Sequence, residues 1–541
     1  MRNIIEMPPL MDYRPNPRGI GYFYYENLTK HSDKIAQIDG KTGKSDTYGD
    51  LLKRCIRTAI YLQGRNVTEG DFISVCSLNH FDSCTPLIAS FFVNAITSAV
   101  DPSLSSADIA FLLRQTKPKV IFTEADSLNR IEAAVELLEY KVTLVVFADS
   151  SQQHVAFAQI LKSYDDDEVD HFRPVPVEDL SEIALVCFSS GTSGPPKPAA
   201  HSHHGLMYSY ANNARSAYNF GLLFGFYSPY WTLFSHGLGT CVSLGTARLL
   251  LPKFDPAHPW EPFHHKVTTA ILNVYQAIRL LSVDRPEGLD TTSLDVLVLT
   301  GGTISNEQLA RVNGLFPGTK ISNVYGQSEV AGYLTQFRLA NLDDVERCGK
   351  KFASVGTGLP GCSYKIVDLG SGAIVGPYQR GELRVKSESQ LSCYYGVVDA
   401  DVYDDEGWLK TGDIAYYDDD YCFYIVERVK EMFKCRGFHV IPAMLESTLL
   451  QHSAIALAVV VGVKHEMDGH WPAAIVVLRP ERKSIGADDI RDFVNNRVQD
   501  REKLNGGVKI VDSFPLTASG KVNRRRIREM YANELTTSKI N

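Results

Sequence analysis

The sequence lacks the features that mark secreted, zinc-binding and membrane-spanning proteins. Its ten cysteines are scattered, with no Cys-x-x-Cys pair and no cluster with histidine, which argues against a zinc site and a disulfide framework and indicates a reducing compartment. The first residues contain no signal-peptide core. The most apolar stretch, Cys84–Val100, contains Thr, Ser and Asn, and this predicts a buried helix rather than a membrane span.

Internal repeats, low-complexity tracts and the basic-aromatic pattern of nucleic-acid-binding proteins are also absent. The 541 residues are too many for one core, so two or more domains are expected. The net charge of −8 is uneven, because basic residues outnumber acidic ones only from Arg428 onward. A basic C-terminal part beside an acidic main part suits anionic ligands, but an uneven solvated surface explains it equally well.

Helical and strand-like segments alternate over the first 180 residues, and this alternation predicts a layered, largely parallel α/β sheet. Ser105–Leu113 has the pattern of a capped amphipathic helix, and Lys119–Thr123 that of the strand after it. Asp165–Glu168 is predicted to be an acidic loop. Residues 296–300 are predicted to form a buried strand that ends at Gly301 and Gly302.

The pattern changes twice further along the chain. Shorter strands dominate from about residue 350 to 426, which predicts a barrel-like β region. A smaller α+β unit is predicted to follow Lys430. Its strands are expected at residues 454–463 and 473–478. Its helices are expected at residues 488–498 and 523–535.

A loop of small residues after the apolar run Ile183–Phe188 has the composition of a phosphate-binding loop. Its glycines let backbone N–H groups approach phosphate oxygens, its hydroxyls add donors, and Lys197 adds a mobile positive charge. No Ser or Thr follows the lysine, so the loop is not the usual nucleotide-binding sequence, and taken alone a plain surface connection is the commoner explanation. The loop residues before that lysine are Ser189, Ser190, Gly191, Thr192, Ser193 and Gly194.

Four further motifs follow in order: Tyr325–Glu329, Gly407–Asp413, Ile425–Lys430 with Phe433–Gly437, and Pro515–Lys521. In this order and spacing the chain resembles the adenylate-forming superfamily of acyl-CoA synthetases, aryl-CoA ligases and beetle luciferases. The resemblance runs from about residue 20 to about 532 and is closest to the 4-coumarate–CoA ligase and luciferase branch.

The resemblance implies an α/β fold of two domains. The large N-terminal domain, residues 1–429, would hold two β-sheets with helices and a distorted β-barrel. The small C-terminal domain, residues 430–541, would be a mobile α+β lid. The implied cofactors are Mg²⁺, ATP and CoA, and the implied partner is a small carboxylic acid, fatty or aryl.

The implied reaction has two steps. A carboxylate attacks the α-phosphate of ATP, giving an acyl-adenylate and pyrophosphate, and a thiol, usually that of CoA, then displaces AMP. Because a carboxylate and a triphosphate repel each other, the site must neutralise charge and align the attack. In this family the loop from Ser189 to Lys197 would hold the β- and γ-phosphates. Glu329 would bind Mg²⁺, and Ser328 would offer its hydroxyl to the α-phosphate.

The resemblance also implies how the nucleoside is held. Tyr325 would stack on adenine, followed in the motif by Gly326 and Gln327. Asp413 would accept hydrogen bonds from both ribose hydroxyls, and Arg428 would reach the ribose from the domain junction. Backbone at Gly301 and Gly302 would approach the adenine and acyl groups.

Three residues would carry the chemistry. Lys521 would bridge the carboxylate and the α-phosphate, and His236 would lie near the acyl group. Rotation of the small domain about a hinge at Lys430 would then remove Lys521 and bring in Lys434 for thioester formation. Gly437 and His439 would belong to that second step.

The sequence departs from the family pattern at several positions. Pro198 follows the loop lysine, so the loop exit must differ locally. Glu427 replaces the usual Asp before Arg428, and His439 replaces a Gln. Tyr275 and Tyr333 reshape the expected acyl pocket. Two alternatives therefore stay open beside the ligase: a luciferase-type monooxygenase, and an adenylate- or acyl-binding relative that has lost catalysis.

The expected location is intracellular, cytoplasmic or peroxisomal. The chain ends in Ser538-Lys-Ile-Asn541, which is not a clean peroxisomal address because the last residue displaces the tripeptide.

Overall fold

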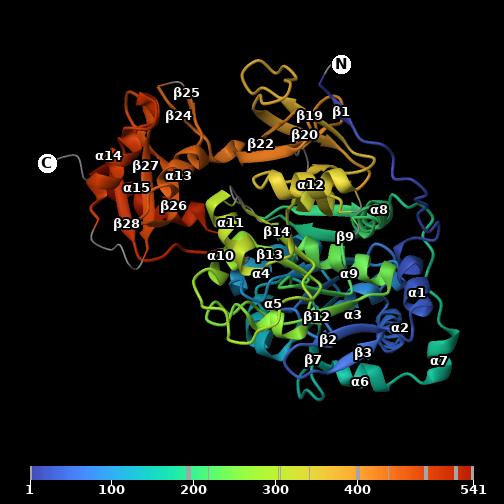
Figure 1. Cartoon of the computed structure of the whole chain (residues 1–541). Helices are drawn as coiled ribbons and strands as arrows, with labels where there is room; N and C mark the ends of the chain where they lie inside the picture. Colours follow the sequence, from blue (N-terminus) through green and yellow to red (C-terminus); the bar gives the residue numbers. More distant parts are fainter. Residues whose placement is uncertain are drawn as a thin grey trace.

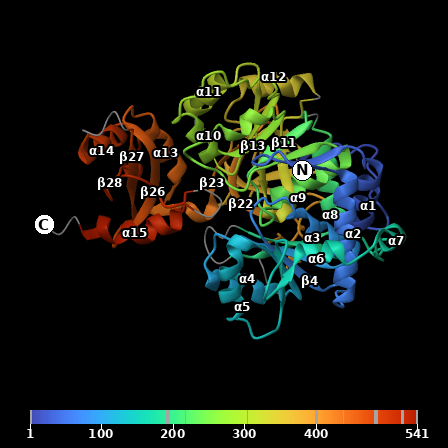
Figure 2. The ribbon, with the colours of Figure 1, turned by 90° about the horizontal axis from the view of Figure 1, so that it is seen from below.

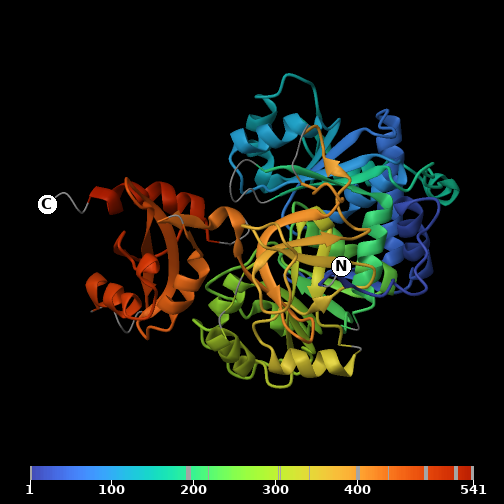
Figure 3. The ribbon, with the colours of Figure 1, turned by 90° about the horizontal axis from the view of Figure 1, so that it is seen from above.

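The structure, a computed structural model, describes residues 3–189, 196–216, 218–302, 304, 306–339, 341–397, 402–436, 438–479, 485–516 and 522–537. Figure 1 shows a large body and, beside it, a smaller C-terminal unit in orange and red. The same division is visible from below (Figure 2) and from above (Figure 3). Within the described residues, no helix combines the length and the apolar character that a membrane span requires.

A seven-stranded sheet forms one layer of the large body. Its strand order is β15-β14-β13-β11-β12-β2-β3, parallel except for the β2–β3 pair. Helices α10 and α11 pack on it through Leu280 and Val312, which share a core with Leu297. The strands and these helices are β2 Ile35–Asp39, β3 Ser45–Thr47, β11 Leu222–Gly225, β12 Ala247–Leu250, β13 Thr269–Asn273, β14 Val296–Thr300, β15 Lys320–Asn323, α10 Val274–Leu280 and α11 Asn306–Leu315.

An eight-stranded sheet forms a second layer, in the order β21-β10-β9-β5-β4-β6-β7-β8. The β9–β10 and β10–β21 pairs are antiparallel and the others parallel. Helices α4 and α5 share an apolar core with β6. These elements are β4 Phe72–Cys76, β5 Ile96–Val100, β6 Val120–Glu124, β7 Thr143–Phe147, β8 Val155–Ala156, β9 Ile183–Phe188, β10 Pro198–Ser202, β21 Cys393–Tyr394, α4 Ser106–Thr116 and α5 Leu128–Val135.

Further helices share a third apolar cluster with strand β4. Tyr24 of α1 and Tyr210 of α8 are among its fully buried side chains, together with Leu238 of α9. Burying these rings supplies a large share of the hydrophobic stabilisation. The helices are α1 Ile20–Lys30, α2 Tyr48–Gly64, α3 Cys84–Phe92, α6 Phe157–Lys162, α7 Asp166–His171, α8 His203–Ala214 and α9 Thr232–Leu244.

The structure corrects two predictions in this part of the chain. Cys84–Val100 is not one helix: α3 ends at Phe92, Asn94 turns the chain with a φ of 56°, and the remainder is strand β5. Asp165–Glu168 is not a loop either, because the Asp165 side chain accepts a hydrogen bond from the Glu168 N–H and begins α7 with a capping box. The helix predicted from Ser105 is confirmed, and Ser105 is its N-cap.

The barrel-like region is a five-stranded antiparallel sheet in the order β1-β19-β20-β22-β23, with a separate three-stranded sheet, β16-β17-β18, beside it. Helix α12 follows β17 in the chain. The elements are β1 Ile5–Glu6, β16 Tyr325–Gln327, β17 Gly332–Gln336, β18 Thr357–Gly358, β19 Ser363–Val367, β20 Gly381–Lys386, β22 Leu409–Tyr417, β23 Phe423–Arg428 and α12 Leu342–Lys350. The α/β fold class with two sheets and a barrel-like region is thus confirmed.

The C-terminal unit is the α+β unit that the sequence predicts. Its sheet has the order β25-β24-β27-β26, with β28 paired to β27, and Lys430 lies in the 3-10 turn Val429–Glu431 before it. Helices α13 and α14 share one apolar cluster with the sheet, and α15 another. The elements are β24 Phe433–Cys435, β25 Phe438–Val440, β26 Ile455–His465, β27 Gly469–Leu478, β28 Val508–Val511, α13 Pro442–Leu450, α14 Ala487–Asn495 and α15 Arg524–Thr537.

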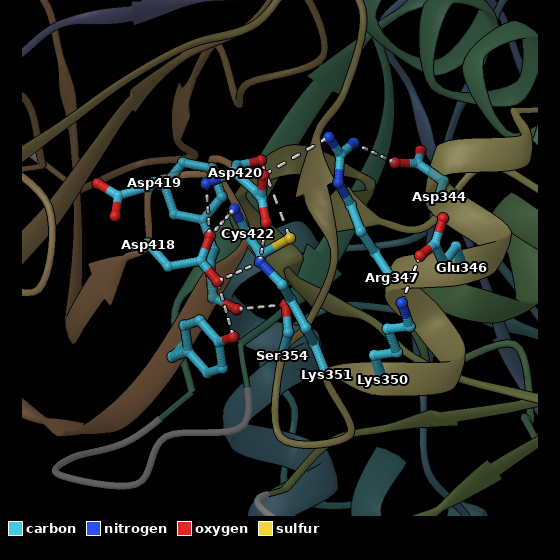
Figure 4. Close-up of polar contacts among 12 residues, drawn as sticks. Asp344, Glu346, Arg347, Lys350, Lys351, Ser354, Asp418, Asp419, Asp420 and Cys422 are labelled. Atoms are coloured by element: carbon cyan, nitrogen blue, oxygen red, sulfur yellow. Dashed lines mark hydrogen bonds and ion pairs between the residues drawn. The ribbon is translucent and has the colours of Figure 1, made fainter.

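A charged brace joins the end of α12 to the turn between β22 and β23 (Figure 4). The Lys351 ammonium donates to Asp418 at 2.7 Å and to Asp420 at 2.5 Å. Asp418 is only 6% exposed, and its carboxylate also accepts from the Tyr424 hydroxyl at 2.9 Å. A buried carboxylate needs donors and a counter-charge, so Lys351 helps to hold this turn against α12.

We expect Lys351→Met to destabilise the protein by about 1–3 kcal/mol, because the buried Asp418 carboxylate loses its cation. Lys350→Met is the matched control, since Lys350 pairs only with the exposed Glu346 one helical turn away and should leave stability nearly unchanged. Thermal and urea unfolding midpoints of the two variants provide the measurement. Equal midpoints would show that the brace does not stabilise the fold.

Candidate active site

A cavity of about 1230 Å³ lies where the two large sheets meet the barrel-like sheet and the start of the C-terminal unit. The carboxyl ends of β13 and β14 contribute Asn273 and Gly301 to its wall. Ligands of open α/β sheets bind at such strand ends. Of the predicted site residues, the cavity is lined by Ser189, Lys197, Gly301, Gly326, Gln327, Ser328, Glu329, Arg428 and Lys430.

Next to Arg428, which lines this cavity, a buried carboxylate is held by two donors from different strands; that carboxylate, on Asp413, and its partner Tyr325 are not among the described cavity-lining residues. Asp413 on β22 is 2% exposed. Its Oδ1 lies 2.7 Å from Nε of Arg428, and its Oδ2 accepts from the Tyr325 hydroxyl at 2.6 Å. Burial and the Asp413 charge both raise the pKa of Tyr325, so this phenol stays a donor. The structure therefore brings together the three residues expected at the nucleoside.

A second group joins the expected phosphate and metal residues. The Tyr394 hydroxyl donates to Oε1 of Glu329 at 2.6 Å, and the Lys197 ammonium lies 5.0 Å from the centroid of the Tyr394 ring. Beside Glu329, the carbonyl of Ser328 is 2.7 Å from Nε2 of the buried His201. A carboxylate, a hydroxyl and a mobile cation thus border the same cavity.

The ends of the phosphate loop meet in a short antiparallel arrangement. Ser189 N–H donates to the Lys197 carbonyl at 2.8 Å, and Lys197 N–H donates to the Ser189 hydroxyl at 3.0 Å. Pro198 begins β10, where its missing N–H is tolerated, and its carbonyl accepts from the Tyr395 N–H at 2.8 Å. Of the predicted loop residues, Ser190, Gly191, Thr192, Ser193 and Gly194 lie outside the described residues.

His236, expected near the acyl group, is buried in contact with the cavity-lining Tyr333. It lies inside helix α9, 2% exposed, and is not among the described residues that line the large cavity. Its Nδ1 is 2.9 Å from the Ser209 hydroxyl, and the Tyr333 ring packs edge-on against it at 4.8 Å. Burial lowers the pKa of His236 to about 4, so the imidazole is neutral at neutral pH. Tyr333 therefore stands between His236 and the cavity.

Close packing around His236 requires a small residue at position 332. A Cβ at Gly332 would lie 2.5 Å from Nδ1 of His236, a distance that real Cβ contacts do not show. The expected small residues at the end of β14 are also present: Gly301, at the cavity, has a left-handed φ of 74°, and Gly302 follows it.

Aromatic side chains form the wall of the cavity on the side of β11, α9 and β17. Trp231, the N-cap residue of α9, lines the cavity five positions before His236. The rings of Phe254 and Tyr275 meet edge-on at 6.1 Å. The hydroxyls of Tyr227 and Tyr333 have no hydrogen-bond partner among the described residues. This wall suits the apolar part of a compact ligand.

The residues expected from the C-terminal unit fall into two groups. Leu516, close before Lys521 in the sequence, lines the cavity, while Lys521 itself lies outside the described residues. Lys434 and His439 are exposed partners across the β24–β25 pair and are not among the described cavity-lining residues. Gly437 lies outside the described residues.

The cavity-lining residues that sequence reasoning missed include Trp231, Tyr394 and Lys410. Lys410 lies inside the Gly407–Asp413 motif, so the motif itself is the signal that marks it. Tyr394 carries no local motif, and only its pairing with the phosphate-loop exit reveals it.

The chain matches known proteins along nearly its whole length. The family model described as "AMP-binding enzyme" matches residues 24–395, and "AMP-binding enzyme C-terminal domain" matches residues 444–521. Among curated relatives, luciferin 4-monooxygenase of Photuris pensylvanica is 29% identical, with 98% of each chain covered. 4-Coumarate–CoA ligase 2 of Petroselinum crispum is 28% identical, over 96% of this chain and 95% of the relative.

Solved structures of the same kinds of enzyme also resemble this chain. The luciferase-like enzyme of the nonluminescent mealworm Zophobas morio is 34% identical, with a TM-score of 0.74, and covers 80% of this chain and 100% of its own. The anthranilate CoA ligase AuaEII, solved with anthranoyl-AMP, is 20% identical with a TM-score of 0.81 and covers 96% of this chain and 98% of its own, a likeness of fold. The protein therefore belongs to the AMP-binding enzymes of the adenylate-forming superfamily.

Proposed function

We propose that this enzyme is an ATP- and Mg²⁺-dependent carboxylate–CoA ligase that forms an acyl-adenylate and then an acyl-CoA thioester. The observation that carries the proposal is the buried Asp413 carboxylate held by Tyr325 and Arg428, and Arg428 lines the same cavity as Glu329 and Lys197. The first group suits a ribose diol and a base, and the second suits a triphosphate.

In the first step the acid substrate's carboxylate attacks the α-phosphate, and pyrophosphate leaves. Both reactants are anionic, so the chain must neutralise charge before they meet. Lys197 provides a mobile cation at the phosphate loop, and Ser328 provides a hydroxyl beside it. We assign the transition-state charge to Lys521. In the second step the thiol of CoA displaces AMP from the acyl carbon.

The residues present fit a Mg²⁺ ion that arrives with the nucleotide. Mg²⁺ prefers one or two carboxylates together with substrate phosphates rather than a complete protein cage. Glu329 is such a single carboxylate at the cavity, and the described residues contain no group of three potential metal ligands. When bound, the ion supplies charge neutralisation at the phosphates. Glu329 is the residue we assign to hold it, and Ser328 would offer its hydroxyl to the α-phosphate.

A second candidate is a luciferase-type monooxygenase, which adenylates an acid and then oxidises it with O₂. The likeness to the Photuris luciferase favours it, since that relative matches as much of the chain as the ligases do. A third hypothesis is an adenylate- or acyl-binding relative without catalysis, which the departures from the family pattern at Pro198 and His439 favour. Pro198 is accommodated at the start of β10, so this departure does not by itself disrupt the described loop ends.

A pyrophosphate-release assay over a panel of fatty and aryl acids separates these functions. A ligase consumes ATP with its best acid and forms a thioester only when CoA is present. A monooxygenase consumes O₂ with its substrate and emits light without CoA. A chain that releases no pyrophosphate with any acid, and yet binds ATP, would overturn the proposed activity.

We expect Asp413→Asn to raise the KM for ATP about tenfold or more, because a charge-assisted hydrogen bond contributes roughly 1.5–3 kcal/mol. Tyr325→Phe is the matched control: it removes the phenol that contacts Asp413 but keeps the ring and the carboxylate, so its effect should be smaller. ATP titrations of initial rate and of thermal midpoint measure both. An Asp413 variant with an unchanged ATP dependence would contradict the ribose assignment.

Lys521→Ala and Lys434→Ala should separate the two half-reactions. We expect Lys521→Ala to lower ATP–pyrophosphate exchange by about 100-fold or more while ATP binding changes little, since its charge acts in the transition state. Lys434→Ala should spare exchange and slow transfer to CoA, because it serves the rotated orientation of the C-terminal unit. Equal losses in both half-reactions for both variants would count against rotation about Lys430.

The Tyr333 ring lies between the cavity and His236 and would limit the space for an acyl chain. We therefore expect a preference for compact acids over long-chain ones. Tyr333→Ala should open the cavity toward His236 and raise kcat/KM for longer acids at least about tenfold, since each newly buried methylene contributes about 0.8 kcal/mol. Tyr275→Ala is the control, because Tyr275 belongs to the same aromatic wall but packs against Phe254 rather than His236, and it should leave the length preference in place. An unchanged chain-length profile in Tyr333→Ala would show that this ring does not limit the acyl site.

A further inference from the structure

The short strand β21 ties two distant parts of the active site together. Leu391 N–H donates to the Glu329 carbonyl at 2.7 Å, and Ser392 N–H donates to the Ala200 carbonyl at 2.8 Å. Tyr395 N–H then donates to Pro198, directly after the phosphate-loop lysine. Three residues of the segment 391–395 therefore bond through their backbone N–H groups to the Tyr325–Glu329 motif and to strand β10 at the loop exit.

The side chain at the middle of this tie faces the same two parts. The Tyr394 hydroxyl donates to Oε1 of Glu329 at 2.6 Å, and its ring lies 5.0 Å from the Lys197 ammonium. Tyr394 is 8% exposed and lines the cavity. One residue thus contacts the carboxylate assigned to the metal and the cation assigned to the phosphates, through two different chemical groups.

Each contact restricts a side chain that would otherwise be mobile. A hydroxyl that donates to a carboxylate forms a short, charge-assisted bond and selects one rotamer of the Glu329 side chain. An ammonium over a phenol ring is attracted by the ring's quadrupole, which limits the many rotamers of a lysine.

We propose that Tyr394 is a positioning residue that presents Glu329 to the nucleotide-bound cation and Lys197 to the phosphates at a fixed separation. The inference rests on the proposed function, because it assumes that this cavity binds Mg²⁺ with ATP. Tyr394 itself transfers no proton and forms no bond in the reaction. Its effect is exerted through the two charged groups that it contacts.

The test uses the whole enzyme and two substitutions that divide the contacts. Tyr394→Phe keeps the ring under Lys197 and removes the hydroxyl, whereas Tyr394→Leu removes both. Tyr395→Phe is the matched control, because that neighbouring ring packs edge-on against Phe72 at 5.0 Å instead. ATP binding is measured by calorimetry across a series of Mg²⁺ concentrations, and ATP–pyrophosphate exchange is measured in parallel.

In Tyr394→Phe we expect the Mg²⁺ concentration for half-maximal ATP binding to rise about tenfold, because one charge-assisted hydrogen bond is lost. The KM for the acid should stay unchanged. Tyr394→Leu should in addition weaken ATP binding at saturating Mg²⁺ by about threefold, through the lost cation–π contact. Tyr395→Phe should titrate like the wild type. A purely structural role would instead change the thermal midpoint without changing the Mg²⁺ dependence.

A double-mutant cycle with Glu329→Gln keeps the inference falsifiable if the leucine variant does not fold. If Tyr394 acts through Glu329, adding Tyr394→Phe to Glu329→Gln should weaken Mg²⁺-dependent ATP binding by less than twofold further. Additive losses, or a wild-type Mg²⁺ dependence in Tyr394→Phe, would overturn the inference alone. A wild-type protein that binds no ATP at any Mg²⁺ concentration would overturn the proposed function and this inference together.

Discussion

The ion pair between Asp413 and Arg428 joins the proposed nucleoside site to the domain junction. Asp413 lies on β22 and Arg428 is its register partner on β23, so the ion pair is built into the hairpin. Tyr325 joins the pair from a different sheet. Because the chain reaches the C-terminal unit two residues after Arg428, the proposed nucleoside site and the domain junction share one charged group. The Lys351 brace holds the opposite end of the same hairpin.

The proposed chemistry depends on placing opposite charges along the cavity without letting them collapse onto one another. Arg428 is balanced by Asp413, and Glu329 is separated from Lys197 by the ring and hydroxyl of Tyr394. Among the described residues Lys197 has no carboxylate partner and lies over a neutral ring, so its charge stays available to a phosphate. An ion pair in that place would have to be broken for every turnover, at a cost in free energy.

Sequence patterns predict helices and strands correctly where neighbouring residues determine the local structure. They do not predict side-chain positions that depend on contacts between residues far apart in the sequence. Ser105 begins its helix as expected, because a cap acts over three residues. The acidic residues Asp165 and Glu168 read as a loop because a capping box and a charged surface turn have similar compositions. The role of His236 near the acyl group comes from the resemblance and stays a prediction, whereas Trp231, at the start of the same helix α9, lines the cavity and carries no motif that marks it. The link between Glu329 and Tyr394 joins residues 65 positions apart, which no local pattern reveals.

The domain junction shows how the substitution of Glu for Asp before Arg428 affects the proposed rotation. Glu427 is buried, its Oε1 accepts from Arg428 N–H at 2.9 Å, and its Oε2 accepts from Ala443 N–H at 3.0 Å. Ala443 lies in the first turn of α13, so Glu427 satisfies a free N–H of a helix that belongs to the other side of the hinge. A rotation about Lys430 must break this bond, together with the 3.6 Å pair between Glu307 and Arg479. Both contacts join groups that water can satisfy after they part, which keeps the free-energy difference between two orientations small enough for a ligand to reverse.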